Sequence, residues 1–511
     1  MQTTTTRRER RKLTPRQRVT RALDWVPLQF ALVGIVALLS RLVLFAFSAP
    51  GIYFSDSWDY IVTASGQTGS PSRFHSPFLY RVWTLGTFGS PDAASVLWFQ
   101  LVLGVGTTVI VFAIVRLFTE KKLAMLWALL CSLLPAQLFA ERSFLTETTT
   151  SFLIALAVMC LIFIAPQRRL VINAGLAFVA FAAAGCMVAV RPALQVVGLT
   201  LFASISYRLV RLRTGGRDLR MRLTQKLAVI SVGCVIGLVP CAYLASWYES
   251  SYNNFSIAPG QAIDLFARWG SLVPCSEATA HQGPVREAVL EVCDQPFAAM
   301  PGSGTNAIWS EDSTLSWLMQ SPDPQVAEEQ ELKSIALQAM MSHPSRVAGE
   351  MTRSIVWQLS GPPYVASDLY HNGSRWLHLR TSDGVKRVVA HWFGDRAHPT
   401  DTHVPLLGAV ESTARVPQLF FALFGLLSLP VWVRSLRRHR RGDPVVRLPR
   451  GLVGAASLVV VASVLTTALG GIPSFRYWTP VWPCLTVLVL ARIVQLVPRA
   501  RRTETAVPSP R

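Results

Sequence analysis

Charged residues are scarce in this chain, and acidic residues are the scarcer kind. Of 511 residues, 15% are charged, with 29 Asp and Glu against 49 Lys and Arg, while 51% are hydrophobic. Soluble domains usually carry about 25% charged residues, and the mean hydropathy here is +0.36. The composition therefore excludes an ordinary soluble enzyme of two or three domains and indicates a protein whose main solvent is the membrane.

The chain also lacks the short motifs of several large enzyme classes. It contains no Walker A loop, no dinucleotide-binding glycine fingerprint, no His-Glu-x-x-His and no Gly-x-Ser-x-Gly. Its apolar runs carry no series of ionisable residues at mid-membrane, which is the usual mark of an ion-coupled transporter. Arg41 falls inside the first apolar run near its outer end, and we expect its side chain to reach out to the interface.

Basic residues account for the formal net charge of +20, and they lie where membrane topology requires them. Every second connection between apolar runs is basic, as the positive-inside rule describes for cytoplasmic loops. The basic segments are "RRERRK", "EKK", "PQRR", "RLRTGGRDLRMRLTQK", "RSLRRHRRGDPVVRLPR" and "PRARR". We therefore expect orientation and anionic lipid, rather than nucleic acid, to explain the positive charge.

The apolar runs predict an all-α polytopic membrane protein with about ten transmembrane helices. The first run is long and follows a basic tail, so we interpret it as a retained signal anchor. With both termini in the cytoplasm, the chain is expected to cross the plasma (inner) membrane many times. The predicted spans are 25–47, 94–117, 122–140, 148–165, 170–190, 192–210, 227–247, 414–435, 451–471 and 478–497.

These spans divide the chain into five parts. The two cytoplasmic tails are 1–24 and 498–511. A module of about seven helices, 25–247, includes the first external loop at 48–93, and a module of about three helices covers 413–497. Between spans seven and eight, residues 248–412 are too long and too polar for a simple connector, so they predict an external subdomain of mixed structure.

One part of this external subdomain has clear helical periodicity. Two amphipathic helices are predicted on either side of Pro344, and we expect them to lie along the membrane surface or against the helix bundle. The first helix presents an apolar face of Leu332, Ile335, Ala336, Ala339 and Met340, and the second a face of Val347, Met351, Ile355 and Leu359.

Cysteine usage fits an oxidising exterior. Six of the eight cysteines fall within apolar spans, where a thiol behaves as a small hydrophobe. Only Cys275 and Cys293 lie in the external subdomain, and this pair is the candidate for a disulfide. A zinc site there is disfavoured because two cysteines without closely spaced histidines make a poor tetrahedral set.

Charged residues gather in four places at the outer ends of the predicted spans. The first is "SDSWDYIVTA", in which a helix would place Asp56, Tyr60 and Ala64 on one face and turn Asp59 aside. The other three are "LPAQLFAERSFLTETTTSFL" with Glu141, Arg142 and Glu147, "VRPAL" with Arg191, and "SFRYWTPVWP" with Arg476 and Tyr477.

Each of these residues also has a plainer interpretation. Asp56 and Asp59 are suited to a helix cap and a solvated acid just outside a span. Glu147 is placed to cap the fourth span or to pair with Arg142. Arg476 is placed to anchor a helix at the interface. Only their combined presence on one side of the membrane favours a site.

Taken together, the motifs resemble the GT-C class of integral-membrane glycosyltransferases, in particular the protein O-mannosyltransferase-like and polyprenyl-phosphate-sugar-dependent enzymes. Asp56, Tyr60 and Ala64 match an Asp…Tyr…Ala pattern shortly after the first span, and "FHSPFLYRVWTLGTFG" matches a proline-containing stretch before the second. Glu147 matches an acidic residue at the start of the fourth span. Arg476, Tyr477 and Pro480 match the Arg-Tyr…Pro opening of the last helix.

The resemblance implies transfer of a sugar from a polyprenyl-phosphate-linked donor to an acceptor hydroxyl outside the cell. Asp56 is the candidate base and Arg476 the candidate phosphate clamp, and attack opposite the phosphate would invert the anomeric carbon. The acceptor is expected to be a cell-envelope glycan, a glycolipid or a protein. No cofactor is expected, and a divalent metal is left open. Further substrate-binding candidates are Tyr477, Tyr60, Glu147, Arg191, Arg142 and Arg81.

Two other classes of protein fit the same composition. A lipid or polysaccharide transporter has many helices and an outer polar cavity, but it does not need a fixed acid and arginine confined to one side. A non-catalytic cell-envelope scaffold would use residues 248–412 for binding and would tolerate the loss of Asp56.

Overall fold

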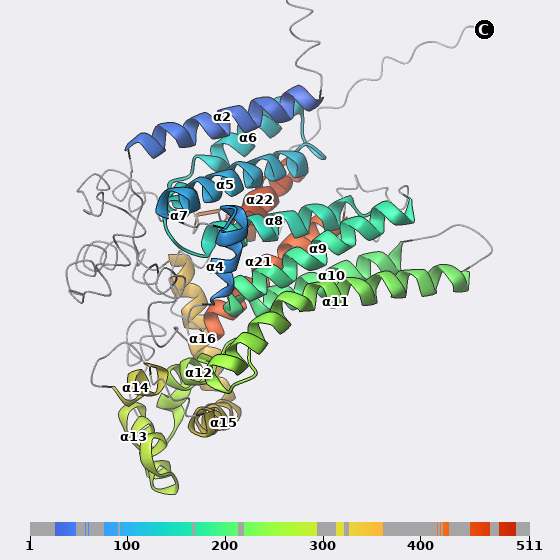
Figure 1. The fold of residues 1–511 in the computed structure, drawn as a ribbon. Helices are drawn as coiled ribbons and strands as arrows, with labels where there is room; N and C mark the ends of the chain where they lie inside the picture. Colours follow the sequence, from blue (N-terminus) through green and yellow to red (C-terminus); the bar gives the residue numbers. More distant parts are fainter. Residues whose placement is uncertain are drawn as a thin grey trace, which may run out of the picture.

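The described part of the chain is built from α-helices and short 3-10 helices. The computed structural model describes residues 26–47, 57, 60, 76–89, 92–165, 169–212, 219–293, 313–320, 326–360, 416, 419–420, 423–428, 450–470 and 480–496. Figure 1 shows the long helices running roughly side by side, with a group of shorter helices at one end.

Five described helices are long and apolar enough to cross a membrane, by length and composition. They are α2 (Val26–Phe47), α5 (Ala93–Val115), α9 (Leu170–Val190), α10 (Gln195–Arg211) with the 3-10 turn η1 (Pro192–Leu194) before it, and α11 (Leu219–Tyr252). Three further helices contain shorter apolar stretches, namely α8 (Glu147–Phe163), α21 (Arg450–Gly470, apolar over Ala456–Ala468) and α22 (Trp482–Leu496). The described part of this membrane protein is thus helical, and the full set of ten spans stays a prediction.

Small residues allow the long helices to approach one another closely. A side chain at Gly185 of α9 would collide with the backbone of Gly237 in α11, and a side chain at Gly237 would meet Phe202 of α10. Close backbone approach at small residues is the usual way in which helices associate in membranes, where apolar contact alone gives little preference for a helical neighbour over lipid. One apolar core cluster then joins residues of α2, α5, α6, α8, α9, α10, α21 and α22.

The predicted third span, 122–140, is not one helix. The chain instead forms α6 (Lys121–Ser132) and α7 (Pro135–Arg142), separated by Leu133 and Leu134. Proline lacks a backbone N–H and disfavours a helical conformation in the residue before it. Leu134 is accordingly extended and Pro135 begins the new helix. Hydropathy alone passes over this break because both sides of it are apolar.

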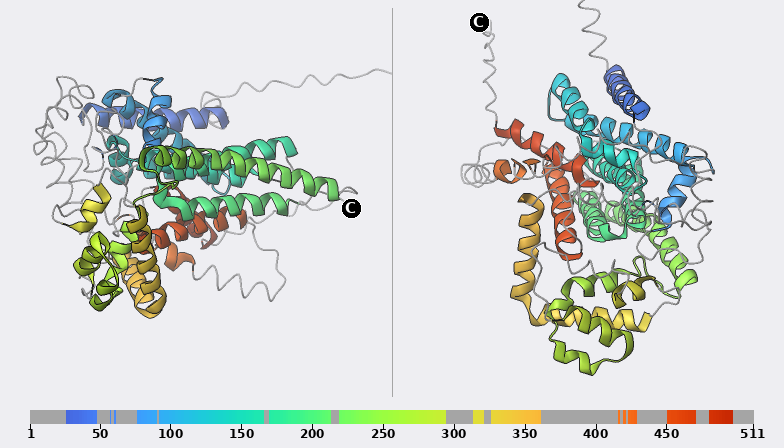
Figure 2. Two further views of the ribbon diagram at one scale, coloured as in Figure 1. Left: turned by 60° about the horizontal axis from the view of Figure 1, so that its bottom comes forward. Right: turned by 90° about the vertical axis from the view of Figure 1, so that its left-hand side faces the viewer.

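The shorter helices between α11 and α21 share an apolar core of their own. The two helices predicted around Pro344 are present as α15 (Val326–Ser342) and α16 (Pro344–Ser360). Leu332, Ile335, Ala336 and Ala339 are buried in this core as the periodicity predicted. The remaining members are α12 (Gln261–Trp269), α13 (Gly283–Val292), α14 (Thr314–Gln320) and the 3-10 helices η2 (Gly270–Leu272) and η3 (Cys275–Ala280). We call this group the helical cluster, and Figure 2 shows it from two further sides.

A buried arginine joins the helical cluster to the long helices. Arg268 of α12 donates from Nη2 to the hydroxyl of Ser354 in α16 at 2.6 Å and to the carbonyl of Ala468 in α21 at 2.9 Å. Burial lowers the pKa of Arg268 to about 10, so the side chain stays protonated at neutral pH. A cation at the last turn of α21 is also favoured by the helix dipole.

A disulfide closes part of the helical cluster. Cys275 and Cys293 are bonded, with their Cα atoms 5.1 Å apart and a separation of 18 positions in the sequence. The bond ties the start of η3 to the residue that follows α13.

Removing this disulfide is expected to destabilise the helical cluster by about 3 kcal/mol, the loop-entropy value for a loop of this length. The Cys275→Ser/Cys293→Ser variant should therefore be cut faster by protease between α12 and α16 than the wild type. The Cys131→Ser variant is the control, because that cysteine is free and buried in α6. Equal cleavage rates in the wild type and the double variant would contradict the prediction.

Candidate functional site

One end of the long helices is covered by a short helix that crosses them. This is α4 (Phe78–Gly86), which contacts both α5 and α9 and lies across them in Figure 1. Leu79 and Trp83 of α4 are fully buried against the first turn of α5 and the segment Phe144–Leu145. The Ser76 hydroxyl just before α4 donates to the carbonyl of Ala189 at 2.5 Å. We call this region the α4 end.

Tyr60 is held at the α4 end by aromatic contacts. Its ring lies edge-on to that of Trp83, with 6.4 Å between centroids, and Trp83 lies edge-on to Phe144 at the same distance. Tyr60 shares its apolar cluster with Leu145 and Val190. Those two residues stand beside Thr146 and Arg191 in the sequence, so three predicted segments meet here.

A buried ion pair forms the polar centre of the α4 end. Arg191, at the end of α9, lies with Nη1 2.7 Å from Oε1 of Glu147, the first residue of α8. The same Nη1 donates to the hydroxyl of Thr146 at 3.1 Å. Glu147 is 2% exposed and Arg191 is 8% exposed. The carboxylate therefore pairs with Arg191, and the predicted alternative of pairing with Arg142 is not the one the structure shows.

The first turn of α8 adds buried hydroxyl groups beside this pair. Residues 147–151, with the sequence Glu-Thr-Thr-Thr-Ser, are all buried. Within the described residues, the hydroxyls of Thr148 and Thr149 have no hydrogen-bond partner. A helix N-terminus presents free backbone N–H groups and a partial positive charge, which together favour an anion. Sequence reasoning missed both threonines, although the run of polar residues opening an apolar helix was visible.

Arg142 and Arg81 occupy different surroundings. Arg142 ends α7 and is buried, and burial lowers its pKa to about 10, so it remains cationic at neutral pH. Arg81 of α4 is exposed and donates from Nε to the hydroxyl of Tyr243 in α11 at 3.0 Å. Arg142 can therefore contribute charge inside the α4 end, whereas Arg81 contributes it on the surface.

A second buried ion pair joins α2 to α7. Arg41 donates to both carboxylate oxygens of Glu141, from Nε at 2.5 Å and from Nη2 at 2.7 Å. Both residues are almost fully buried. Gln137 donates to the same carboxylate at 2.9 Å, and Ser132 accepts from Arg41 at 3.3 Å. The expectation that Arg41 reaches the interface is therefore wrong, because its side chain turns inward to a partner 100 residues away.

Gly104 of α5 makes room for this second pair. A Cβ atom at this position would occupy the space of the Glu141 carboxylate. The glycine is therefore explained by close approach of a side chain rather than by its backbone conformation.

Asp56, Arg476 and Tyr477 lie outside the described residues. The described residues that follow them most closely in the sequence are Ser57 and Tyr60 after Asp56 and Pro480 after Tyr477, and all three are buried. Within the described residues, no three His, Cys, Asp or Glu side chains are grouped so that they could hold a metal ion. The structure thus brings Tyr60, Glu147 and Arg191 together, whereas Arg81 lies on the surface beside Tyr243.

Comparison with known proteins gives one structural likeness. No family model and no curated protein matches the chain. Among solved structures, the chain is similar to ArnT from Cupriavidus metallidurans, crystallised with undecaprenyl phosphate. The sequences are 14% identical over 92% of this chain and 78% of that chain, with a TM-score of 0.29. Two folds cannot be equated at that score, so the assignment of this site rests on its own residues.

Proposed function

We propose that the protein is a membrane glycosyltransferase of the GT-C class. It transfers a sugar from a polyprenyl-phosphate-linked donor to an acceptor hydroxyl at the external face of the plasma membrane. The product belongs to a cell-envelope glycan, glycolipid or glycoprotein. The α4 end is the active site in this proposal, and both termini are cytoplasmic.

The observation that carries the proposal is the meeting of Tyr60, Glu147 and Arg191 at one end of an all-helical membrane protein. The three residues come from separate segments, and all are buried at the α4 end. Tyr60 and Glu147 were predicted as site residues from the GT-C resemblance. Arg191 was predicted because it is a cation at the outer end of a predicted span. A buried guanidinium and a helix N-terminus in one place are suited to a phosphate-bearing substrate, and the Glu147 carboxylate fixes the position of the guanidinium.

The proposed reaction forms one C–O bond and breaks another. The Asp56 carboxylate takes the proton of the acceptor hydroxyl as its oxygen attacks the anomeric carbon. The bond from that carbon to the phosphate oxygen breaks, and the polyprenyl phosphate leaves with the electron pair. Attack from the face opposite the phosphate inverts the anomeric centre.

Positive charge is required where the phosphate leaves. Arg476 is proposed to hold the phosphate oxygens in two-point contact, with Tyr477 beside it. Arg191 and Arg142 add positive charge, and the hydroxyls of Thr148 and Thr149 can donate hydrogen bonds. Electrostatic stabilisation by one such group is commonly worth about 100-fold to 1000-fold in rate.

Transfer from a radiolabelled polyprenyl-phosphate sugar pool tests the proposal. Membranes containing wild-type protein should pass label to an acceptor, and the Asp56→Asn and Arg476→Ala variants should lose this transfer by at least about 100-fold. Expression is matched by immunoblot. Asp59→Asn is the control for Asp56→Asn, because it removes a carboxylate only three residues away. Arg211→Ala is the control for Arg476→Ala, because it removes an arginine that ends α10 beside Tyr207.

Two outcomes would count against the proposal. If Asp56→Asn transfers label as fast as Asp59→Asn, the base is elsewhere. If the wild type passes no label but carries labelled lipid from one leaflet to the other in vesicles, the protein is a transporter. Activity in the controls together with loss in both site variants supports catalysis at the α4 end.

A further inference from the structure

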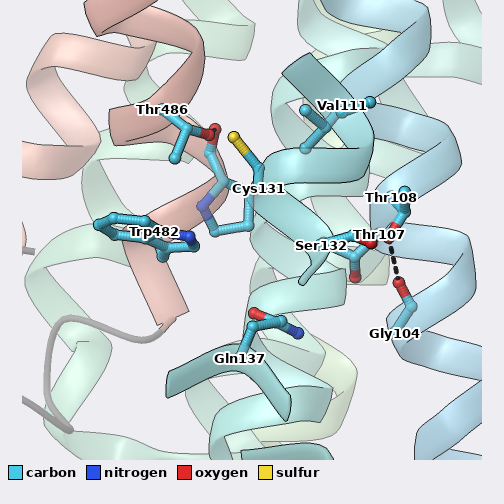
Figure 3. A pocket seen from close by; sticks show the side chains of 11 residues that line it. Gly104, Thr107, Thr108, Val111, Cys131, Ser132, Gln137, Trp482 and Thr486 are labelled. Carbon is cyan, nitrogen blue, oxygen red and sulfur yellow. Dashed lines mark hydrogen bonds between the residues drawn. The ribbon is translucent and has the colours of Figure 1, made fainter. Parts of the chain in front are cut away.

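A small cavity lies inside the protein, between α5, α6, α7 and α22. Its volume is about 20 Å³. Figure 3 shows polar side chains from all four helices among the residues that line it, although most of the lining surface is apolar. The polar side chains on the lining are Thr107, Thr108, Ser132, Gln137, Trp482 and Thr486.

Two side chains on this lining have a polar atom without a partner. Among the described residues, the amide oxygen of Gln137 and the indole N–H of Trp482 form no hydrogen bond. Gln137 is 4% exposed and Trp482 is 5% exposed. Figure 3 shows the Gln137 amide oxygen on the side that faces the Trp482 indole. An acceptor and a donor are therefore both buried and both border the cavity.

The broken third span supplies a second reason for a polar interior here. The cavity is flanked by Ser132, the last residue of α6, and by Gln137 in the first turn of α7. Pro135 interrupts the helix between them, so the last carbonyls of α6 cannot accept hydrogen bonds from the N–H groups of a continuing helix. Irregular backbone at membrane depth is tolerated where it is buried in protein or lines a cavity that holds water.

We propose that this cavity binds one water molecule that bridges Gln137 and Trp482. A water molecule needs about 10–15 Å³ of space that the centre of a water-sized sphere can reach, and two to four polar partners. The volume of this cavity therefore suits one water molecule and not two. The water accepts a hydrogen bond from the Trp482 N–H and donates one to the Gln137 amide oxygen.

The rest of the lining completes the hydrogen bonds of the water. The hydroxyl protons of Thr107 and Thr486 are already donated to backbone carbonyls, so their oxygens remain as acceptors for the second water proton. The indole N–H disfavours a metal cation at the same place, because a donor would point its positive end at the ion. A neutral ligand with both donors and acceptors therefore fits best.

The bridge joins two elements that come from opposite ends of the sequence. Gln137 stands in α7, which ends at Arg142, and Trp482 begins α22 six residues after Arg476. The water would therefore hold α22 against α7 without direct contact between the two side chains. This inference does not depend on the proposed activity, because it concerns only the packing of the helices.

A double-mutant cycle tests the bridge. The Gln137→Leu and Trp482→Phe variants and their combination are unfolded in mixed detergent micelles, and the unfolding equilibrium constants are compared. We expect the unfolding equilibrium constant of the double variant to rise less than the product of the rises in the two single variants, by a factor of about three or more. The cycle cancels the separate loss of the Gln137 hydrogen bond to Glu141.

Gln100→Leu provides the matched control for this cycle. Gln100 of α5 is also buried, and within the described residues its amide atoms have no partner, but it does not line the cavity. Its combination with Trp482→Phe should show multiplicative effects. Coupling for Gln137 no larger than for Gln100 would overturn the proposal.

A density map of the wild-type protein provides a test that does not rely on the variants folding. A peak within hydrogen-bond distance of both the Trp482 indole nitrogen and the Gln137 amide oxygen is the expected result. A cavity without such a peak, or a direct hydrogen bond between the two side chains, would overturn the proposal.

Discussion

Replacing Glu147 with glutamine is expected to reduce sugar transfer by at least about 100-fold and to lower the free energy of unfolding by about 3–5 kcal/mol. The buried Arg191 guanidinium would keep its charge but lose the carboxylate that now lies 2.7 Å away. Removal of one partner from a buried pair leaves a charge without compensation. Transfer rates and equilibrium unfolding in mixed micelles measure the two effects separately.

The double variant Glu147→Gln/Arg191→Gln separates structure from catalysis. Both charges are removed, so most of the lost stability should return. Transfer should remain reduced, because the positive charge that Arg191 is proposed to add at the phosphate would still be missing. Arg191→Lys is the conservative control, since it keeps the charge but not the planar two-point geometry. A double variant that transfers sugar at the wild-type rate would show that the pair is structural only.

Removing either member of the Arg41–Glu141 pair is expected to cost about 3–5 kcal/mol of stability. In Glu141→Leu the Arg41 guanidinium loses two hydrogen bonds of 2.5 Å and 2.7 Å, and in Arg41→Met the carboxylate loses its cation. The combined variant replaces the pair with apolar side chains of similar size and should recover most of this loss. Thermal and detergent-induced unfolding of the four proteins provides the comparison.

Gly104→Ala tests the same pair without removing a charge. Its Cβ atom would take the place of the Glu141 carboxylate, so the ion pair should shift and stability should fall. Gly175→Ala in α9 is the control, because nothing lies within 4 Å of a Cβ atom there. For the combined Arg41→Met/Glu141→Leu variant of the preceding prediction, a loss of stability equal to the sum of the two single losses would show that the two charges act independently.

The positions of most helices followed from hydropathy because a span needs a continuous apolar run. The predicted span 94–117 differs by only one or two residues at each end from α5, and the predicted span 170–190 coincides with α9. Asp92 caps the N-terminus of α5, because its side chain accepts a hydrogen bond from the backbone N–H of Ser95. The third span was predicted as one helix because the apolar run continues through Pro135.

Partners in the candidate site were much harder to predict than helices. Glu147 was correctly placed at the start of the fourth span, but its observed partner, Arg191, is 44 residues away, whereas the sequence suggested only the nearer Arg142 as a partner. Arg41 was predicted to reach the interface because it falls near the outer end of the first apolar run. The carboxylate of its partner, Glu141, lies 100 residues away in the sequence. Only the packing of α2 against α5, α6 and α7 brings the two side chains together. Helix periodicity carries no information about such pairs.

The length of α11 has a mechanical consequence for the helical cluster. At 34 residues it extends about 51 Å, whereas the hydrocarbon core is about 30 Å thick. Pro240 lies within it, and Figure 1 shows the helix changing direction before it leads to α12. Because α11 is continuous, it fixes the position of the cluster together with the contacts that α12 and α16 make with α21. A residue added to α11 would shift its end by about 1.5 Å and rotate it by about 100°, so these contacts with α21 would have to break or α11 would have to bend.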